Sequence, residues 1–462
     1  MKTKNKIYLL VTASLILPAV GYLPPVTSLM SRNAWVFCGC FLFMIILLIG
    51  KVMESYFAML TTMALLAVLQ VCPFRELASE FASPTLWLCI GVFLMSIGIS
   101  NSGIGKRVAL RILLLFPNTY WGHMTAMLVS GLVTTPVLPS DMAKTSIMAP
   151  IVEEVCVAVG AKPGSRASLG LWFPNFMCTC LLGMAFLSGS TNTVIMVEFI
   201  GQSFAWLEWI RFTAIWFLVM LALTYVFCMA YCLRDGQKNC GGQTFIKEKY
   251  RQLGPLSKKE KQGFAIVGTA LIFWITQSFH GISPEIIALL AAASFSLCGM
   301  ISAREFGDRG MWTTTVFVGG MLGLAKLIQK LGIGTWLAKL MSGLIPHIIS
   351  SPYLFVIVIC LVIYLCRYIL TAPMCCGAIF IAVLAPLSNQ FGISMFMLVY
   401  VVWTSSCCWN AAYTNPAYTA LIKMTNGAVD DQTARTGSYA YCVMNLIALL
   451  CCIPYWKALM LC

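Results

Sequence analysis

The sequence predicts an all-α membrane protein with about 11 transmembrane helices and two re-entrant helical hairpins, arranged as an inverted repeat. Of its 462 residues, 60% are apolar and only 10% are charged, whereas a soluble protein carries about 25% charged residues. Apolar runs long enough to cross a bilayer recur along the chain. A backbone in lipid satisfies its own hydrogen bonds only in helices or closed barrels. The two halves of the chain also match each other at a constant spacing.

Residues 1–33 are expected to form the first transmembrane helix. The segment starts with basic residues and continues as an apolar run, which is also the pattern of a secretory signal peptide. No small-x-small cleavage motif follows it, and the rest of the chain is equally apolar. We therefore expect this helix to be retained.

Residues 234–262 form a plainly hydrophilic linker that carries eight Lys and Arg residues. Loops rich in Lys and Arg mark the cytoplasmic side of a membrane protein. We expect the linker and the N-terminus to be cytoplasmic, in a protein that crosses the cell membrane many times. The formal net charge is +14, and because the basic residues lie in loops, the lipid bilayer rather than nucleic acid is the expected partner.

The linker divides the chain into a first repeat, residues 34–233, and a second repeat, residues 263–462. Gly103–Gly105 matches Gly332–Gly334 at an offset of 229 in the numbering, and the apolar segments on either side keep the same offset. Five crossings are expected between the start of the first repeat and the linker. Because five is odd, the second repeat is expected to be inverted in the membrane.

Two polar breaks interrupt the apolar runs of the first repeat. A hairpin tip near 139–142 presents Ser140 and Asp141 at the start of a helix, where backbone N–H groups and the positive dipole end favour an anion. Ordinary N-capping is the alternative interpretation. An ionised Asp at membrane depth needs a cation, either Lys144 one turn later or a bound ion. The second break, near 188–193, favours a broken helix over Ser and Thr side chains bonding within an unbroken one.

The second repeat contains a corresponding pair of breaks. A hairpin tip is expected near 371–374 and a broken helix near 410–416. Pro373 and Pro416 cannot continue a helix from the preceding turn without losing a backbone hydrogen bond. Paired breaks in two halves indicate a binding site near the midplane, where all four breaks are expected to converge.

At these breaks the chain resembles the divalent anion:sodium symporter family of dicarboxylate, citrate and sulfate transporters. Pro139–Lys144 resembles the family's Pro-Ser-Asn-Thr-Ala-Arg hairpin tip, and Phe186–Gly189 resembles the Phe-Leu-Thr-Gly run before its first broken helix. Gly332–Ala338 and Thr414–Ala417 resemble second-half segments of the family. The resemblance covers most of the chain. It implies a secondary active transporter of a small anion, such as a di- or tricarboxylate, working by cation-coupled symport and alternating access as a homodimer.

The resemblance also places the family's binding roles on matching positions of this chain. It implies that the small anionic substrate is bound by Ser140, Met142, Asn192, Thr193, Thr371, Ala372, Pro373, Asn415 and Pro416. Na⁺ is the one coupling ion that it implies, with no other cofactor. The implied sodium ligands are Ser140, Asp141, Gly189, Thr371, Asn410 and Thr414.

Four positions depart from the family's pattern. Asp141 replaces an Asn, Met142 and Pro373 each replace a Thr, and Cys375 stands where many members have His. Asp141 either strengthens a cation site, accepts a proton or pairs internally with Lys144. In the last case the chain resembles the members that exchange anions without sodium, in which fixed cationic groups replace the ion.

Two other functional classes have less support. A membrane metalloprotease needs the motif H-E-x-x-H, which the sequence lacks, and no enzyme activity is expected. The acids expected within the membrane are not spaced as a catalytic pair; they are Asp141, Glu153, Glu154 and Glu198. A passive channel of the same fold stays open as an interpretation, because only a carrier shows counterflow.

Overall fold

The structure is a computed structural model, and none of the residues it describes forms a β-strand. The all-α class is therefore confirmed for the described chain. Residues 1–29 of the expected first helix lie outside it, as does Thr371 of the expected second tip. The described residues are 30–49, 52–136, 138, 140–232, 242–307, 309–333, 336, 351–370, 372–391, 393–411, 414–425 and 427–461.

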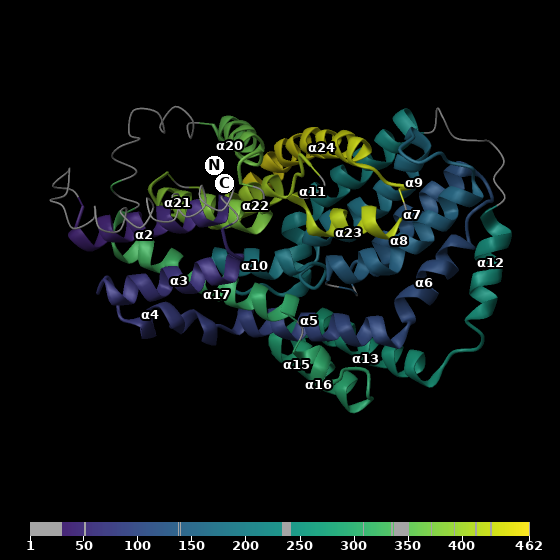
Figure 1. Cartoon of the computed structure of the whole chain (residues 1–462), viewed down its shortest axis with the longest axis horizontal. Coiled ribbons are helices and arrows are strands. Elements are labelled where there is room, and N and C mark those ends of the chain that lie inside the picture. The colour runs from purple at the N-terminus through teal and green to yellow at the C-terminus, as the bar shows by residue number, and fades with distance from the viewer. Residues whose placement is uncertain are drawn as a thin grey trace, which may run out of the picture.

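Helices follow one another along both halves of the described chain (Figure 1). The first half contains α2 (Arg32–Ile49), α3 (Ser55–Val68), α4 (Phe74–Ala78), η1 (Ser79–Ala82), α5 (Pro84–Ser102), α6 (Ile104–Leu113), α7 (Tyr120–Thr134), α8 (Asp141–Ala158), α9 (Arg166–Phe176), η2 (Met177–Leu181), η3 (Leu182–Ala185), α10 (Thr191–Ile200), α11 (Trp206–Phe227) and η4 (Cys228–Cys232). After α12 (Gly242–Gln252), the second half contains α13 (Lys258–Ile275), α14 (Gln277–His280), α15 (Pro284–Leu297), α16 (Ala303–Phe306), α17 (Arg309–Lys330), α20 (Pro352–Cys366), α21 (Pro373–Phe391), α22 (Met395–Ser406), α23 (Pro416–Met424) and α24 (Asp431–Ala458).

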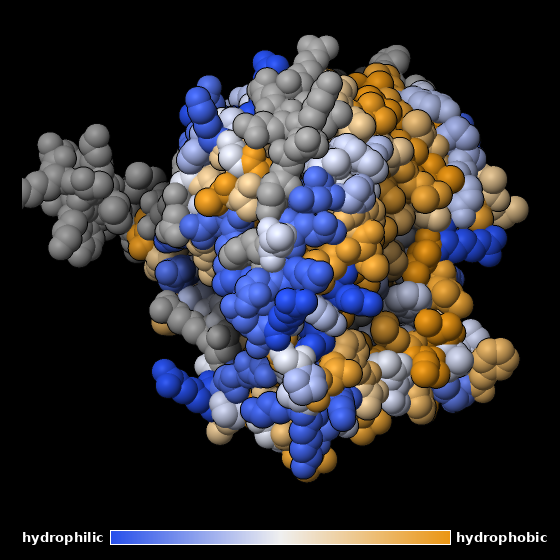
Figure 2. Space-filling model, turned by 90° about the vertical axis from the view of Figure 1, so that its right-hand side faces the viewer, coloured by the Kyte–Doolittle hydropathy of each residue, from blue (hydrophilic) through white to orange (hydrophobic). Residues whose placement is uncertain are grey.

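Most of the long helices run along the longest axis of the molecule, whereas α12 crosses that direction at one end (Figure 1). Figure 2 faces this end and shows hydrophilic side chains gathered over it, with hydrophobic side chains along one flank. This pattern is typical of a membrane protein whose helix ends meet water. Four described helical stretches are long and apolar enough to cross a bilayer: Arg166–Ala185, Trp206–Cys232, Ala303–Lys330 and Asp431–Ala458.

A bent pair makes a fifth candidate span. Phe74–Ala82 and Leu86–Ser102 meet at 48° and together have the length and composition of a crossing. Shorter apolar helices of 10–17 residues account for much of the remaining described chain. The count of about 11 crossings stays a prediction from the bilayer's thickness.

The two halves keep the register that the glycine motifs predicted. Helices α3 and α15 run from 55 to 68 and from 284 to 297, so both of their ends are related by the offset of 229. Gly103 and its counterpart Gly332 both adopt a left-handed backbone, with φ of 83° and 67°. Gln70 and Gly299, related by the same offset, do so with φ of 55° and 68°. These matches support our proposal of an internal repeat.

Packing between the halves is reciprocal. Helix α5 lies against α15, and its counterpart α17 lies against α3, the counterpart of α15. A Cβ added to Gly91 of α5 would lie 2.9 Å from the Cβ of Ala288, and one added to Gly320 of α17 would lie 2.3 Å from the Cγ of Met59. Ala288 and Met59 are themselves related by the same offset. The glycine match therefore marks two equivalent close helix contacts.

The breaks that the sequence predicted lie where helices begin. Helices α8 and α21 follow the two expected hairpin tips and start at Asp141 and Pro373. Helices α10 and α23 follow the two broken segments and start at Thr191 and Pro416. The linker contains more regular structure than expected, because α12 lies within it and α13 starts within it at Lys258.

Candidate functional site

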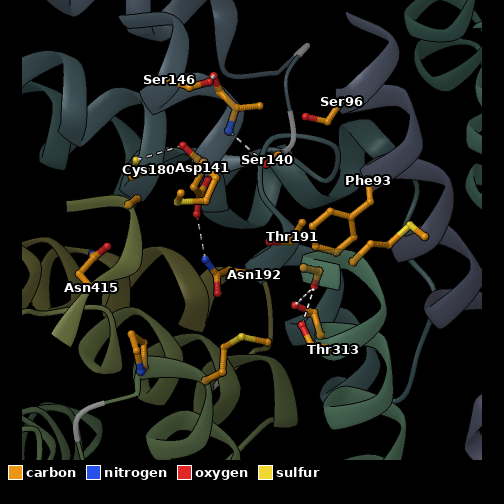
Figure 3. A pocket seen from close by; sticks show the side chains of 18 of the residues that line it. Phe93, Ser96, Ser140, Asp141, Ser146, Cys180, Thr191, Asn192, Thr313 and Asn415 are labelled. Atoms are coloured by element: carbon orange, nitrogen blue, oxygen red, sulfur yellow. Dashed lines mark hydrogen bonds between the residues drawn. The ribbon is translucent and has the colours of Figure 1, made fainter. Parts of the chain in front are cut away.

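A cavity of about 990 Å³ lies where the four breaks meet. The first turns of α8, α10, α21 and α23 all line it, and α5 and α17 supply the facing wall. Figure 3 shows Ser140, Asp141 and Asn192 on one side of this space, with Phe93 and Ser96 on another. The convergence predicted from the paired breaks is therefore present in the structure.

Most of the residues that the resemblance assigned to binding line the cavity. They are Ser140, Asp141, Met142, Asn192, Ala372, Pro373, Thr414 and Asn415. Three others lie elsewhere: Thr193 is buried and its Oγ1 lies 3.5 Å from Gly183 O, Gly189 is buried in the loop before α10, and Asn410 follows α22. Thr371 lies outside the described residues, and for Pro416 only the backbone position is described.

Lys144 joins the expected first hairpin tip to the expected first broken segment. Its Nζ donates to the backbone oxygen of Gly189 at 2.8 Å and lies 3.2 Å from Asp141 Oδ1. The Lys144 side chain is fully buried, whereas 19% of the Asp141 side chain is exposed. The internal pair that the sequence left open is thus formed. Such a buried pair is stable because each charge compensates the other, whereas either charge alone would be buried without a counter-charge.

The Asp141 carboxylate has two further partners on the broken segment. Ser190 Oγ lies 3.4 Å from Oδ1, and Asn192 Nδ2 donates to Oδ2 at 3.3 Å. Ser140 performs the capping role considered above, because its Oγ accepts from the backbone N–H of Ala143 at 3.2 Å. Capping and ligand binding remain compatible, since Ser140 also lines the cavity.

A close backbone approach gives the first broken segment its shape. A Cβ added to Gly189 would lie 2.6 Å from Gly183 O, and a Cβ added to Gly183 would lie 2.5 Å from Gly189 O. Real Cβ atoms do not come this close to backbone oxygen. Only glycine fits at both positions, and this fit brings the Gly189 carbonyl within reach of Lys144.

The second hairpin is held in a comparable way by Arg367, which the sequence analysis did not single out. This fully buried side chain follows α20 and donates to Cys408 O from Nε at 3.1 Å and from Nη2 at 2.8 Å. Nη2 also donates to Thr414 O at 3.1 Å, and Nη1 donates to Leu370 O. One signal was available: an Arg directly after an apolar helix is costly at membrane depth and marks a functional position.

The buried cations of the two expected hairpins lie on opposite arms: Lys144 lies after the first tip, and Arg367 lies before the second. Helices α7 and α20 run from 120 to 134 and from 352 to 366, so they are related by a shift of 232 in the numbering. At this shift Arg367 corresponds to Thr135, whose Oγ1 donates to Cys178 O at 2.7 Å. Lys144 corresponds to Cys376. Each expected hairpin therefore has a buried cation on the arm where the other has an uncharged residue.

A side chain from the second half reaches the first. Trp403 Nε1 on α22 donates to Asn192 Oδ1 at 3.2 Å, while Asn192 Nδ2 donates to Asp141. The first tip, the first broken segment and the second half are thereby connected through one amide. Trp403 is buried, so this contact lies away from bulk water.

Several polar residues that the sequence analysis missed also line the cavity. Ser96, Ser100 and Asn101 come from α5, and Thr313 and Thr314 come from α17. Ser96 and Ser100 are four residues apart on a largely apolar helix, a spacing that puts them on one face. That spacing is the signal that could have found them. Three thiols also line the cavity, those of Cys180, Cys375 and Cys407.

Comparison with known proteins agrees with the fold. The model of the family described as "Sodium:sulfate symporter transmembrane region" matches residues 4–462. The inner membrane protein YbhI of Escherichia coli is 25% identical over 356 residues, which are 74% of each chain. The L-tartrate/succinate antiporter of Escherichia coli is 25% identical over 310 residues, 63% of this chain and 61% of the relative.

A solved structure has the same fold. MtrF of Neisseria gonorrhoeae, described as illuminating a class of antimetabolite efflux pumps, matches with a TM-score of 0.55 and 14% identity, over 98% of this chain and 95% of its own. The family match spans nearly the whole sequence, and the all-helical fold of the described residues is consistent with a transmembrane region. The chain is a multi-pass membrane protein and belongs to the family of the sodium:sulfate symporter transmembrane region.

Proposed function

We propose that this protein is a carrier that exchanges small carboxylate-bearing anions across the membrane without sodium. The observation that carries the proposal is the meeting of four helix N-termini at one cavity. The N-terminus of a helix attracts an anion through its backbone N–H groups and its dipole. Broken helices paired between two halves are also the arrangement that alternating-access carriers use.

The names of two relatives indicate which substrates to test first. One is named as an L-tartrate/succinate antiporter and another as a dicarboxylate transporter of spinach chloroplasts. Both names concern small organic anions with two carboxylates. We therefore take succinate, malate and related dicarboxylates as the starting panel.

Two buried cations favour exchange over sodium symport. The expected sodium ligands Asp141, Gly189 and Thr414 offer carboxylate and carbonyl oxygens, which suit a small hard cation. Lys144 Nζ contacts the first two, and Arg367 Nη2 contacts the carbonyl of Thr414. A covalently attached cation supplies its charge throughout the cycle, so no ion has to enter with the substrate. The alternative is symport with a sodium ion bound by all the expected ligands. The counterflow experiment below distinguishes it from sodium-free exchange.

The orientation in the membrane and the oligomeric state belong to the same proposal. The basic end of the molecule that carries α12 is proposed to face the cytoplasm, because Lys and Arg gather there. The family implies a homodimer, with each protomer holding its own cavity.

Counterflow in proteoliposomes tests the function. Vesicles loaded with an unlabelled anion are diluted into the labelled anion, with sodium or with choline as the external cation. We expect uptake that needs the internal anion and is unchanged by choline. Uptake that needs sodium and proceeds into empty vesicles would instead establish symport. Linear flux without counterflow would establish a channel.

A further inference from the structure

The charged side chains of the described residues that line the cavity are all acidic. Asp141 and Glu305 are those residues, and the described lining includes no Lys, Arg or His. The Asp141 carboxylate is partly exposed to the cavity, while its partner Lys144 is fully buried behind it. An incoming ligand therefore meets the carboxylate of this pair and not the ammonium group.

The two acids differ in how they are held. Glu305 lies at the start of the α16–α17 segment, where its Oε2 accepts from the backbone N–H of Ser302 at 2.7 Å and its Oε1 accepts from Asn101. It thus acts as a cap for α16. Asp141 stands at the N-terminus of α8, among the four converging helix starts. Asp141 is therefore the acid that a ligand bound at those helix starts would contact.

The side of the cavity formed by α21 and α23 favours a carboxylate instead of a cation. The first turns of α21 and α23 contribute Ala372, Pro373 and Ala417 to the cavity and no described acid. The buried guanidinium of Arg367 lies behind them, bound to the carbonyl of Thr414. A carboxylate is favoured on this side by dipoles and charge, whereas a second carboxylate near Asp141 would be repelled.

An unpartnered hydroxyl in the cavity wall also points to a polar ligand. Ser96 Oγ on α5 is buried, with 2% of the residue exposed, and it has no hydrogen-bond partner among the described residues. A buried polar atom without a partner is costly. A ligand with hydrogen-bonding groups on more than one side would satisfy it.

We propose that the substrate carries an ammonium group beside its carboxylates, as an acidic amino acid does, and that Asp141 is the residue that selects for it. The inference rests on the proposed function and deepens it. An ammonium group donates up to three hydrogen bonds, and a charge-assisted bond to a carboxylate is among the strong ones. The carboxylates of the same substrate lie toward α21 and α23.

Substrates with matched carbon skeletons test this selection. Succinate, malate and aspartate share four carbons and differ at C2 by hydrogen, hydroxyl and ammonium; glutarate and glutamate form a five-carbon pair. Counterflow competition in proteoliposomes measures each ratio. We expect the wild-type protein to prefer aspartate over succinate, and glutamate over glutarate, by about tenfold or more, the factor expected for one strong charge-assisted contact.

Variants then assign the preference to Asp141. Asp141→Asn should bring the aspartate-to-succinate ratio down to about one, since the amide loses the charge, and Asp141→Glu should keep most of it. Glu285→Gln, an acid at the start of α15 outside the cavity lining, is the matched control and should leave the ratio unchanged. Should Asp141→Asn fail to fold, the double variant Asp141→Asn/Lys144→Met removes both charges of the buried pair and gives the same comparison.

The outcomes separate the inference from the function beneath it. If the wild-type protein exchanges succinate as well as or better than aspartate, the inference is overturned, and the proposed anion exchange still stands. A preference for aspartate that survives Asp141→Asn also overturns it. Absence of counterflow for every anion in the panel overturns the proposed function itself.

Discussion

Lys144 Nζ lies 2.8 Å from the carbonyl oxygen of Gly189 and 3.2 Å from Oδ1 of Asp141. These oxygens belong to two of the residues expected to hold a coupling sodium ion. A fully buried ammonium group bound to both supplies the positive charge that such an ion would otherwise bring. This relationship is the basis for the proposed sodium-free exchange.

Lys144→Met should destabilise the protein strongly. Removing one partner of a buried ion pair leaves the other charge uncompensated, at a cost of about 3–5 kcal/mol. We expect a lower midpoint in thermal unfolding, with partial recovery in the double variant Asp141→Asn/Lys144→Met, which removes both charges. If the single variant is as stable as the wild type, the pair does not hold the tip to the broken segment.

Lys144→Met should also create sodium dependence where the protein still folds. With the ammonium group gone, Asp141 and the Gly189 carbonyl become available to a bound cation. Exchange measured with sodium and with choline should then differ, whereas Lys144→Arg should behave as the wild type does. Equal rates in both cations for Lys144→Met would show that Lys144 does not stand in for an ion.

Arg367→Met should lower exchange more than a surface Arg substitution. The guanidinium binds the carbonyls of Cys408, Thr414 and Leu370, and each loses a charge-assisted donor in the variant. Arg211→Met, on the exposed start of α11, is the control. We expect counterflow to fall at least tenfold for Arg367→Met and to stay unchanged for the control; equal rates would show that exchange does not depend on Arg367.

Gly189→Ala should disrupt the first broken segment. The added Cβ would lie 2.6 Å from Gly183 O, so one of the two stretches of backbone has to move. That movement carries the Gly189 carbonyl away from Lys144, and we expect lower thermal stability and weaker substrate binding. Gly268→Ala in α13 is the matched control, because a Cβ there meets nothing within 4 Å.

Two ion pairs outside the cavity should differ sharply in importance. Arg107 on α6 lies 2.6 Å from Glu260 of α13, with both side chains nearly buried, and it also donates to backbone oxygens after α12. Arg107→Met should therefore cost about 3 kcal/mol. Lys326→Met, which loses the exposed pair with Glu80, should cost under about 1 kcal/mol. Similar midpoints for the two variants would contradict this ranking.

The breaks could be read from the sequence because their chemistry is local. Pro373 and Pro416 would each cost a backbone hydrogen bond inside a helix, and helices start at both residues as expected. Ser140 and Asp141 are helix-start residues, and α8 begins there. The offset of 229 could also be read from the sequence, because it appears when one half is compared with the other. Gly91 and Gly320, which match at this offset, each allow a close helix contact.

The partners of the buried charges depended on tertiary structure. No spacing in the sequence connects Lys144 to Gly189 or Arg367 to Cys408, since each pair is joined only after the hairpins fold against the broken segments. The cavity wall formed by α5 and α17 was missed for a similar reason. Ser96 and Ser100 are hydroxyl residues on a largely apolar helix, and such residues more often bond within the helix than line a cavity.

Substrate binding across a sodium series decides whether the buried cations replace a coupling ion. The wild-type protein in detergent is titrated with succinate and with aspartate while choline replaces sodium at constant ionic strength. If Lys144 and Arg367 supply the charge of the ion, the apparent affinity for the substrate is the same at every sodium concentration. An affinity that rises with sodium would show that the ion binds together with the substrate, and it would contradict sodium-free exchange.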